Sequence, residues 1–294
     1  MRFRALVALL AVPTLALGAP KKKGAPAAPA AGEPAPPPTT KTPSPCGDKI
    51  LPLAVGNSWT YEMVPSPLPP DDQIKRISPA EVDSITITVK SIEAAPKGGE
   101  TTITLEEKTS TDLLRDKGDP KHKPVLDEHT YSSTIVCNAK KFEISPESFF
   151  FSGEPGGYIG IKVDSIERPK GTSWQLTNGG IGDQPWREDV HMKWTRTPFE
   201  GSEAKLGSGR IELERQFTPE QPEPVATKLG VYTSEKLGLL TTGRVFSDTA
   251  AADAKPMELP ANWISTLWIA PGAGVVQTLN PYAHMYQLTQ ATLK

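Results

Sequence analysis

Apolar stripes at helical spacing are missing from this sequence, since no window of twelve or more residues carries one. A fold built from amphipathic helices is therefore excluded. The longest apolar run, Ala5–Ala19, holds about 15 residues and would form roughly 22 Å of helix. A hydrocarbon core of about 30 Å needs a longer segment, and Pro13 within the run weakens a spanning helix further. We expect no transmembrane span in the mature chain.

Catalytic and metal-binding patterns are missing as well. The four histidines, His122, His129, His191 and His284, never fall into the His-x-His or His-Glu-x-x-His spacing of metal sites. No Gly-x-Ser-x-Gly elbow is present, and no glycine-rich phosphate loop leads into a helix. Asp189 and His191 would share one face of a strand, as a general base requires, but a solvated polar face is the favoured interpretation. We expect no catalytic residue, no bound metal and no cofactor.

Clusters of basic residues are the third absence. Residues 46–294 contain 26 basic and 33 acidic side chains, so this part of the chain carries a net charge near −7. No group of lysines and arginines interleaved with aromatic residues occurs in it. A nucleic-acid partner is excluded, because phosphate neutralisation needs a basic surface. The same acidic balance disfavours binding of the whole domain to acidic lipids.

The amino-terminal region, in contrast, carries a clear signal. A basic start, Met1–Arg4, precedes the apolar run, which ends in the small residues Ala16-Leu17-Gly18. This order is typical of a secretory signal peptide, and we expect cleavage after Gly18. Because Lys21–Lys23 can oppose translocation, an uncleaved N-terminal anchor stays open as the alternative. The prediction is therefore an exported protein, located in the periplasm or elsewhere in or beyond the cell envelope.

A low-complexity segment follows the signal. Nine of the 26 residues from Pro20 to Pro45 are proline, and most of the others are alanine, lysine or threonine. Such a composition cannot bury enough apolar surface to offset the entropy of ordering. The chain therefore divides into a signal peptide (1–18), a disordered linker rich in proline, alanine and lysine (19–45), and a single domain (46–294).

Only two cysteines occur, Cys46 and Cys137. In an exported chain their oxidation to one disulfide is the simplest expectation. The bond would connect the start of the folded domain to a residue deep within it. Two buried thiols are the alternative, because the sequence does not give the separation of their Cα atoms.

Alternation of apolar and polar residues with period two recurs throughout the domain and predicts half-buried antiparallel strands. Clear examples are Ile85–Val89, Ile103–Leu105, Val190–Trp194 and Ile211–Glu214. Turn signals rich in glycine and proline separate roughly a dozen such runs. The best helix candidate is a short turn at Ser145–Phe151. We therefore predict an all-β fold: a curved antiparallel sheet or half-barrel with long Pro-rich loops and little helix.

A weak internal similarity relates Val55–Tyr61 to Lys170–Leu176, since both place a glycine, polar residues and a tryptophan at the start of a strand. A duplication would divide the domain into two similar halves near residue 165. Two independent uses of one common pattern are the favoured explanation, because glycine permits the turn and tryptophan covers the open end of a sheet.

Two longer motifs carry a resemblance to a known group of proteins. Leu51–Tyr61, with the sequence LPLAVGNSWTY, resembles the opening motif of a family of uncharacterised bacterial exported proteins and lipoproteins. Trp268–Val276, with the sequence WIAPGAGVV, resembles the closing motif of the same family. The residues of these motifs that we expect to have a structural role are Gly56, Trp59, Tyr61, Trp268, Pro271, Gly272 and Gly274.

This resemblance implies a curved antiparallel sheet, distantly similar to the half-barrels of periplasmic lipoprotein carriers, and it implies no activity. The chain departs from many members of the family by lacking their lipid-attachment cysteine.

Tryptophan side chains are candidates for ligand contact. Trp59, Trp194 and Trp268 lie in strand patterns and are expected in the core, whereas Trp186 follows Asp183-Gln184-Pro185 in an expected loop. Trp186 is therefore the candidate surface contact.

The sequence as a whole predicts an exported envelope domain that is not an enzyme and that binds an envelope protein, a lipid or other apolar ligand, or a glycan. Two alternatives stay open. One is a structural or assembly component of an envelope complex, and the other is an exported hydrolase whose carboxylates are placed by the fold.

Overall fold

The computed structural model describes residues 46, 51–69, 72–75, 81–94, 99–114, 123–138, 141–155, 161–171, 181–196, 207–250 and 254–294. The chain divides into two compact units, Met1–Gly32 and Glu33–Lys294, and every described residue belongs to the second. The predicted signal peptide (1–18), its cleavage after Gly18 and the linker (19–45) lie outside the described residues.

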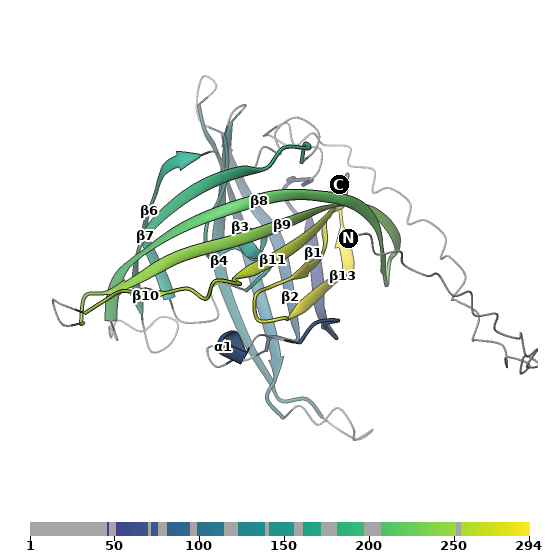
Figure 1. Ribbon diagram of the computed structural model, residues 1–294. Helices are drawn as coiled ribbons and strands as arrows, with labels where there is room; N and C mark the ends of the chain where they lie inside the picture. Colours follow the sequence, from purple (N-terminus) through teal and green to yellow (C-terminus); the bar gives the residue numbers. More distant parts are fainter. Residues whose placement is uncertain are drawn as a thin grey trace, which may run out of the picture. The chain divides into compact units, whose positions relative to one another are not determined.

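Antiparallel strands make up nearly all of the described structure (Figure 1). The strands are β1 (Ser58–Val64), β2 (Ser84–Ala94), β3 (Thr101–Asp112), β4 (Leu126–Asn138), β5 (Lys141–Ile144), β6 (Ile161–Gly171), β7 (Trp186–Arg196), β8 (Gly207–Thr227), β9 (Gly230–Ser247), β10 (Met257–Glu258), β11 (Ile264–Ala270), β12 (Gly274–Leu279) and β13 (Met285–Thr292). Two helices of four residues each, α1 (Asp72–Lys75) and α2 (Phe149–Ser152), complete the described elements. The predicted all-β class and curved antiparallel sheet are confirmed.

All thirteen strands belong to one sheet, in the order β5-β4-β3-β2-β1-β13-β12-β11-β9-β8-β7-β6, with β10 paired to β9. The chain runs outward from β1 to the edge at β5, crosses to the opposite edge at β6, and returns strand by strand to β13, which pairs with β1. The expected division near residue 165 falls inside β6, and the strands on both sides of it belong to this one sheet.

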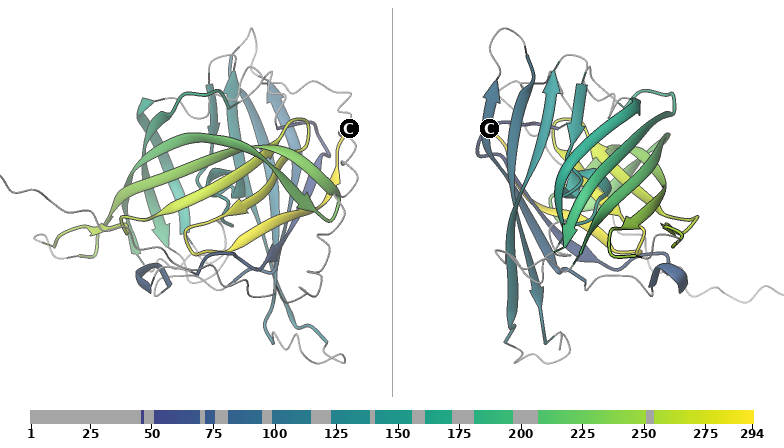
Figure 2. Two further views of the ribbon diagram at one scale, coloured as in Figure 1. Left: turned by 45° about the vertical axis from the view of Figure 1, so that its right-hand side comes forward. Right: turned by 90° about the vertical axis from the view of Figure 1, so that its left-hand side faces the viewer.

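The sheet curves enough for a side chain of one edge strand, β6, to contact the other edge strand, β5. Arg168 on β6 donates a hydrogen bond to the carbonyl oxygen of Ile144 on β5 at 2.7 Å, and its guanidinium lies 3.4 Å from the Glu143 carboxylate. Figure 2 shows the resulting concave side. Helix α2 (teal) lies there, between the part of the sheet that contains β3 and β4 and the part that contains β7 and β8. Side chains on this side form the core.

Alternation explains why these segments form strands. In β2 the residues Ile85, Ile87 and Val89 are buried while the residues between them are partly exposed, as expected for a sheet with one covered face. The other segments predicted from alternation lie in β3, β7 and β8. In each of these strands, the apolar residues of the alternating pattern lie on the concave side of the sheet.

Helix α2 occupies the predicted short turn, and its sequence explains both of its ends. Ser148 caps the first turn, since its hydroxyl accepts a hydrogen bond from Phe150 N at 3.2 Å. Gly153 ends the helix in the left-handed region, with φ of 75°. A Cβ at this position would approach Thr278 Cβ to 2.6 Å, so only glycine fits both the backbone angle and the space.

Strands β8 and β9 form the longest hairpin, and β8 contains prolines that usually interrupt a strand. Pro219, Pro222 and Pro224 all follow Phe217, the last β8 residue in register with β7. Beyond that residue β8 no longer needs hydrogen bonds on its β7 side, so proline is tolerated there. Proline-rich segments were expected in loops, but this one lies within β8, in the part that is paired with β9 and no longer with β7.

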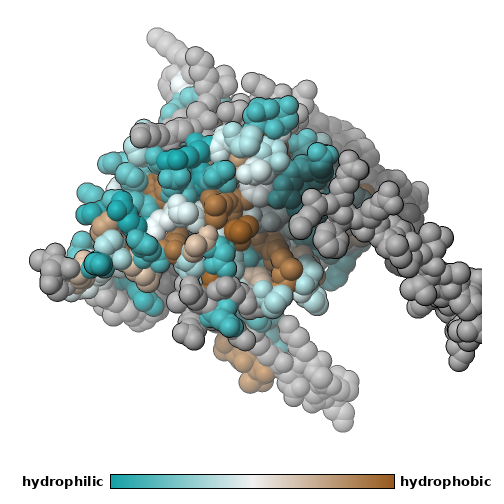
Figure 3. All heavy atoms as spheres, viewed as in Figure 1, coloured by the Kyte–Doolittle hydropathy of each residue, from teal (hydrophilic) through white to brown (hydrophobic). Residues whose placement is uncertain are grey.

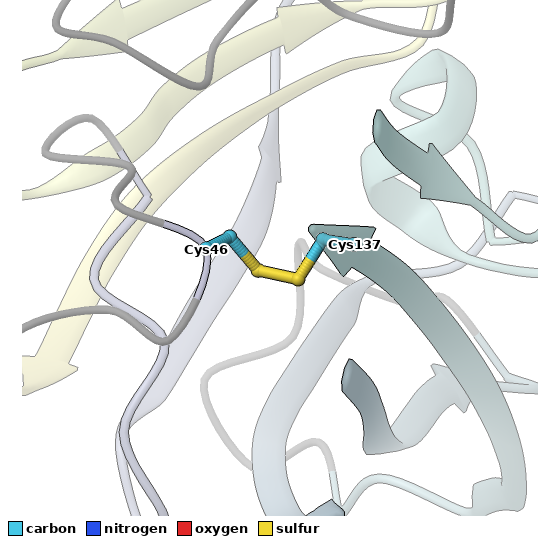
Figure 4. Close-up of a disulfide and its surroundings, with 2 residues drawn as sticks. All are labelled: Cys46 and Cys137. Carbon is cyan, nitrogen blue, oxygen red and sulfur yellow. A yellow bond between two sulfur atoms is a disulfide. The ribbon is translucent and has the colours of Figure 1, made fainter. Parts of the chain in front are cut away.

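A disulfide joins Cys46 to Cys137 at the end of β4, with the Cα atoms 5.7 Å apart (Figure 4). Both residues are buried within the core. The bond therefore attaches the start of the folded domain to the part of the sheet that contains β3, β4 and β5.

Candidate functional site

The two sequence motifs meet in the centre of the sheet. Trp59 Nε1 donates a hydrogen bond to the carbonyl oxygen of Ala273 at 2.7 Å, and the Tyr61 hydroxyl donates to the carbonyl oxygen of Val275 at 2.8 Å. Gly274 lies between these carbonyls with φ of 92°, and a Cβ there would lie 3.3 Å from Trp59 Nε1. These contacts give the opening and closing motifs a role in holding β1 against the turn before β12.

The remaining motif residues fit the same structural role. Gly56 and Gly272 have positive φ angles of 84° and 75°, which favour glycine. Trp268 is buried on β11, and its Nε1 donates a hydrogen bond to the Glu223 carboxylate on β8. Pro271 lies in the exposed turn between β11 and β12.

The prediction that Trp186 is a surface contact is wrong. Its side chain is 8% exposed and stacks on Phe217, with ring centroids 4.9 Å apart and an interplanar angle of 5°. The residue begins β7 instead of lying in a loop, and it is in phase with Val190 on the covered face. This alternation is the sequence signal that points to burial.

The histidines and their acidic neighbours do not converge. His191 is exposed on β7, and the Asp189 carboxylate lies 3.5 Å from Arg187 Nε on the same strand. His129 Nε2 lies 3.2 Å from an Asp127 carboxylate oxygen on β4. His122 lies outside the described residues. Among the residues that the structure describes, no three His, Cys, Asp or Glu side chains are grouped to hold a metal ion.

Aromatic side chains of α2 fill the concave side of the sheet. Phe149 packs against Tyr61 and Tyr286, with ring centroids 4.7 Å and 5.7 Å away, while Phe150 packs against Trp59. All three phenylalanines of the helix are buried. The helix thus fills space on the concave side with aromatic side chains.

A buried carboxylate fixes the start of this helix. Glu107 on β3 accepts hydrogen bonds from Phe149 N at 2.9 Å, the Ser133 hydroxyl at 2.5 Å and the Tyr131 hydroxyl at 3.1 Å. Burial raises the pKa of Glu107, and these hydrogen bonds oppose the rise. Glu107 was not predicted as a buried residue, although it lies on the same face of β3 as the apolar residues Ile103 and Leu105.

The end of the helix contacts a buried ion pair. Arg215 on β8 and Glu188 on β7 are cross-strand neighbours, 1% exposed each, with Nη1 and Oε1 2.5 Å apart. The guanidinium lies 3.5 Å from the ring centroid of Phe151 and also donates a hydrogen bond to the carbonyl oxygen of that residue. Burial lowers the pKa of Arg215 to about 10, so the group stays charged at neutral pH. The pair therefore anchors the helix.

Glu154, just after the helix, makes stability depend on pH. Burial raises its pKa to about 8, and the Tyr282 hydroxyl donates a hydrogen bond to its carboxyl group. The unfolded chain would release this proton near pH 4.5, so the folded protein binds more protons between about pH 4.5 and about pH 8. The contribution of Glu154 to the free energy of unfolding is therefore fully present below about pH 4.5 and is lost as the pH rises to about 8.

We expect Glu154→Gln to remove this loss. Because Glu154 is only half-buried, the variant should exceed the wild type by on the order of 2 kcal/mol near pH 9 and match it near pH 4. Urea denaturation at both pH values measures the difference. Glu258→Gln, an exposed change on β10, is the matched control. Equal pH slopes for wild type and Glu154→Gln would contradict the assignment.

An exposed apolar group lies where the β3–β4 hairpin projects from the body of the sheet. Leu113 and Leu114 follow β3 and are each 60% exposed, while Val125 and Leu126, where β4 begins, are 48% and 54% exposed. We call these four residues the apolar hairpin end. Figures 1 and 2 show the hairpin extending beyond the ends of the neighbouring strands. Figure 3 shows an apolar area where the hairpin leaves the body of the sheet.

Hydrogen bonds hold this hairpin end in shape. Leu113 N donates to the carbonyl oxygen of Val125 at 2.9 Å. The Asp112 carboxylate accepts hydrogen bonds from Leu114 N and Val125 N, both at 3.2 Å. Burying four half-exposed aliphatic side chains would stabilise by roughly 4 kcal/mol. In the domain these four side chains stay about half exposed.

None of the helices among the described segments has the length and apolar character needed to cross a membrane.

No protein-family model matches the chain, and no curated protein is similar to it in sequence. Two solved structures align with it, each over 83% of this chain and 99% of the other, at 10% identity. One, from Bacteroides fragilis, is described as an exported protein with a YmcC-like fold and gives a TM-score of 0.43. The other, from Parabacteroides distasonis, is described as a lipoprotein and gives 0.42. Similarity at this level assigns neither a family nor a role.

Proposed function

We propose that this chain is an exported, non-enzymatic domain of the bacterial envelope that binds its partner through the apolar hairpin end. The observation that carries the proposal is the exposure of four large aliphatic side chains on a projecting, hydrogen-bonded hairpin. Monomeric domains rarely leave such a group uncovered without a use for it.

The disulfide and the amino-terminal sequence support export. Bonds such as Cys46–Cys137 persist in oxidising compartments and are rare in the cytosol. The basic, apolar and small-residue segments of residues 1–18 have the order of a secretory signal. Both features agree with a domain that folds after crossing the inner membrane.

The filled concave side favours surface binding over a ligand held inside. The buried side chains of Phe149, Phe150 and Phe151 fill space on the concave side of the sheet. The Arg215–Glu188 pair lies against the end of the helix. An internal apolar ligand would have to displace α2 and break its hydrogen bonds to Glu107 and Arg215. A partner at the hairpin end requires no such rearrangement.

The same filled interior favours, as a second candidate, an assembly component that is permanently attached to a larger envelope complex. A component of this kind would co-purify with its complex at a fixed ratio through high-salt washing. A reversible binding domain would instead be released as its concentration falls.

Binding of the purified domain to washed envelope membranes tests the role of the hairpin end. We expect Leu113→Ser/Leu114→Ser to reduce the bound fraction at least roughly tenfold, because two half-exposed leucines contribute on the order of 2 kcal/mol to an interface. Leu68→Ser/Met257→Ser is the matched control, since these side chains are 59% and 57% exposed elsewhere. Equal binding by both double variants would refute the proposed function.

A further inference from the structure

Strand β4 is paired along only part of its outer side. β5 pairs with Ile135–Asn138, and Ser145 N extends this pairing by donating to the carbonyl oxygen of Thr134 at 2.8 Å. Among the strands that the structure describes, none pairs with the outer side of Leu126–Ser133. We call this segment the outer edge of β4. An open edge of this kind presents a row of backbone groups to which a further strand can be added.

The strand register shows which backbone groups of this edge point outward. Thr134 directs its carbonyl oxygen away from β3, toward Ser145. In an antiparallel ladder the hydrogen-bonding side alternates from one residue to the next, so the even-numbered residues of β4 point outward and the odd-numbered ones bond to β3. The outward N–H and C=O groups of the edge recur about every 7 Å. They belong to Leu126, Glu128, Thr130 and Ser132.

The side chains along the outer edge are accessible and acidic. It contains two acidic residues, Asp127 and Glu128, and no lysine or arginine, so its net charge is −2 with histidine neutral. The Glu128 carboxylate lies 2.9 Å from Lys108 Nζ on β3, and both side chains are about half exposed. The Asp127 carboxylate lies 3.2 Å from His129 Nε2 and is also partly exposed. Because Asp127 and Glu128 project from opposite faces of β4, a basic side chain on either face of an added strand would meet a carboxylate.

Two other occupants fit this edge less well. A second copy of the same edge would bring its own Asp127 and Glu128 against the first pair, and like charges across a strand pair are unfavourable. The stretch Pro20–Pro45 lacks a backbone N–H at nine of its 26 positions, so it cannot complete a ladder. An extended basic segment meets neither obstacle, and its backbone supplies the complementary row of N–H and C=O groups.

We infer that the partner of this domain is a protein that adds an extended, basic segment to the outer edge of β4 as one further strand. The outward backbone groups of the edge exchange hydrogen bonds with the added strand, and the carboxylates of Asp127 and Glu128 select its basic side chains. Leu126 belongs both to this edge and to the apolar hairpin end, so one partner contacts both surfaces. The inference rests on the proposed function and names the class of partner and the way in which it is held.

Amide hydrogen exchange of the full mature chain, followed by NMR, tests the inference. The probe is a peptide of alternating lysine and valine residues, as long as the outer edge. We expect the peptide to slow exchange at Leu126, Glu128, Thr130 and Ser132 by at least roughly tenfold, because their N–H groups gain hydrogen bonds. A peptide of alternating glutamate and valine should protect these amides far less, and raising the salt concentration should weaken binding of the lysine peptide.

Variants separate the backbone contribution from the charge. Thr130→Pro removes one outward N–H from the middle of the edge, a position at which a strand tolerates proline. It should reduce both peptide affinity and the fraction bound to washed envelope membranes by roughly tenfold. Thr130→Val keeps the N–H and should bind as the wild type does. Asp127→Asn/Glu128→Gln should weaken peptide binding, whereas Glu220→Gln/Glu258→Gln, which changes exposed carboxylates elsewhere, should not.

The outcomes separate this inference from the proposed function. If the lysine peptide leaves the four outward amides unprotected, or if Thr130→Pro binds envelope membranes as Thr130→Val does, the added strand is refuted. Slow exchange of these amides in a free chain that sediments as a dimer would also overturn it, because a second copy would then occupy the edge. Circular dichroism of each variant verifies that the sheet has formed. If Leu113→Ser/Leu114→Ser binds envelope membranes as the wild type does, the proposed function fails, and the exchange measurement still decides whether the edge accepts a strand.

Discussion

Replacing Arg215 with methionine is expected to lower the free energy of unfolding by about 3–5 kcal/mol, one of the two largest effects that we predict for this domain. The change leaves the Glu188 carboxylate without its cation at a site where both side chains are 1% exposed. It also removes the hydrogen bond to the carbonyl oxygen of Phe151 and the stacking on that ring. The loss should appear as a lower urea midpoint with an unchanged slope.

Removing both charges should restore most of this stability. Because a well-packed apolar pair avoids the desolvation of two ions, Arg215→Met/Glu188→Leu should lie within about 1–2 kcal/mol of the wild type. The matched control is Arg187→Met, which breaks the exposed contact of Arg187 with Glu214 at 2.8 Å and should change stability by less than about 1 kcal/mol. If Arg215→Met were no more damaging than Arg187→Met, the buried ion pair would not exist in solution.

Loss of the disulfide is the second large effect. The two cysteines are 91 residues apart, and for a loop of this size the chain-entropy account gives a stabilisation of about 4–5 kcal/mol. We expect Cys46→Ser/Cys137→Ser to lose roughly that amount in urea denaturation. Reductant should lower the stability of the wild type toward that of the double variant and leave the variant unchanged.

Mass measurement supplies an independent check of the same bond. Under denaturing conditions without reductant, the native chain should accept no thiol-alkylating reagent, and after reduction it should accept two equivalents. Alkylation of both thiols without reduction would contradict the disulfide and weaken the argument for export.

The strands could be predicted because each one repeats a two-residue pattern with apolar side chains on one face. Ile85, Ile87 and Val89 show this pattern in the sequence, and all three are buried in β2. Helix α2 could be approached in the same local way, because Ser148 and Gly153 provide cap chemistry at its two ends. Local signals of this kind act over a few residues and do not depend on the neighbours of a strand.

The ion pair was missed because it breaks the pattern that identified the strands. Arg215 stands in the apolar phase between Leu213 and Phe217, and Glu188 stands in the same phase between Trp186 and Val190. Each residue alone suggests a defect in the pattern. Two opposite charges in the apolar phases of paired strands indicate a buried pair, but that inference needs the register between β7 and β8.

The exposure of the apolar hairpin end could not be predicted from the sequence, for a different reason. Leu113-Leu114 and Val125-Leu126 flank a charged stretch in the sequence, which is compatible with a hairpin. Their exposure arises because the neighbouring strands end earlier than β3 and β4 do (Figure 2). No local pattern shows where an adjacent strand stops.

The pairing of β1 with β13 sets the order in which the sheet can be completed. A chain that emerges amino terminus first can join β1 to β2 early, but the other edge of β1 must wait for residues 285–292. Bringing such distant segments together is a slow step, since the connecting loop is long. Until it happens, β1 presents an unpaired edge that can recruit a strand from another chain. A chaperone that shields this edge during synthesis and secretion would therefore act on the middle of the finished sheet, not on its rim.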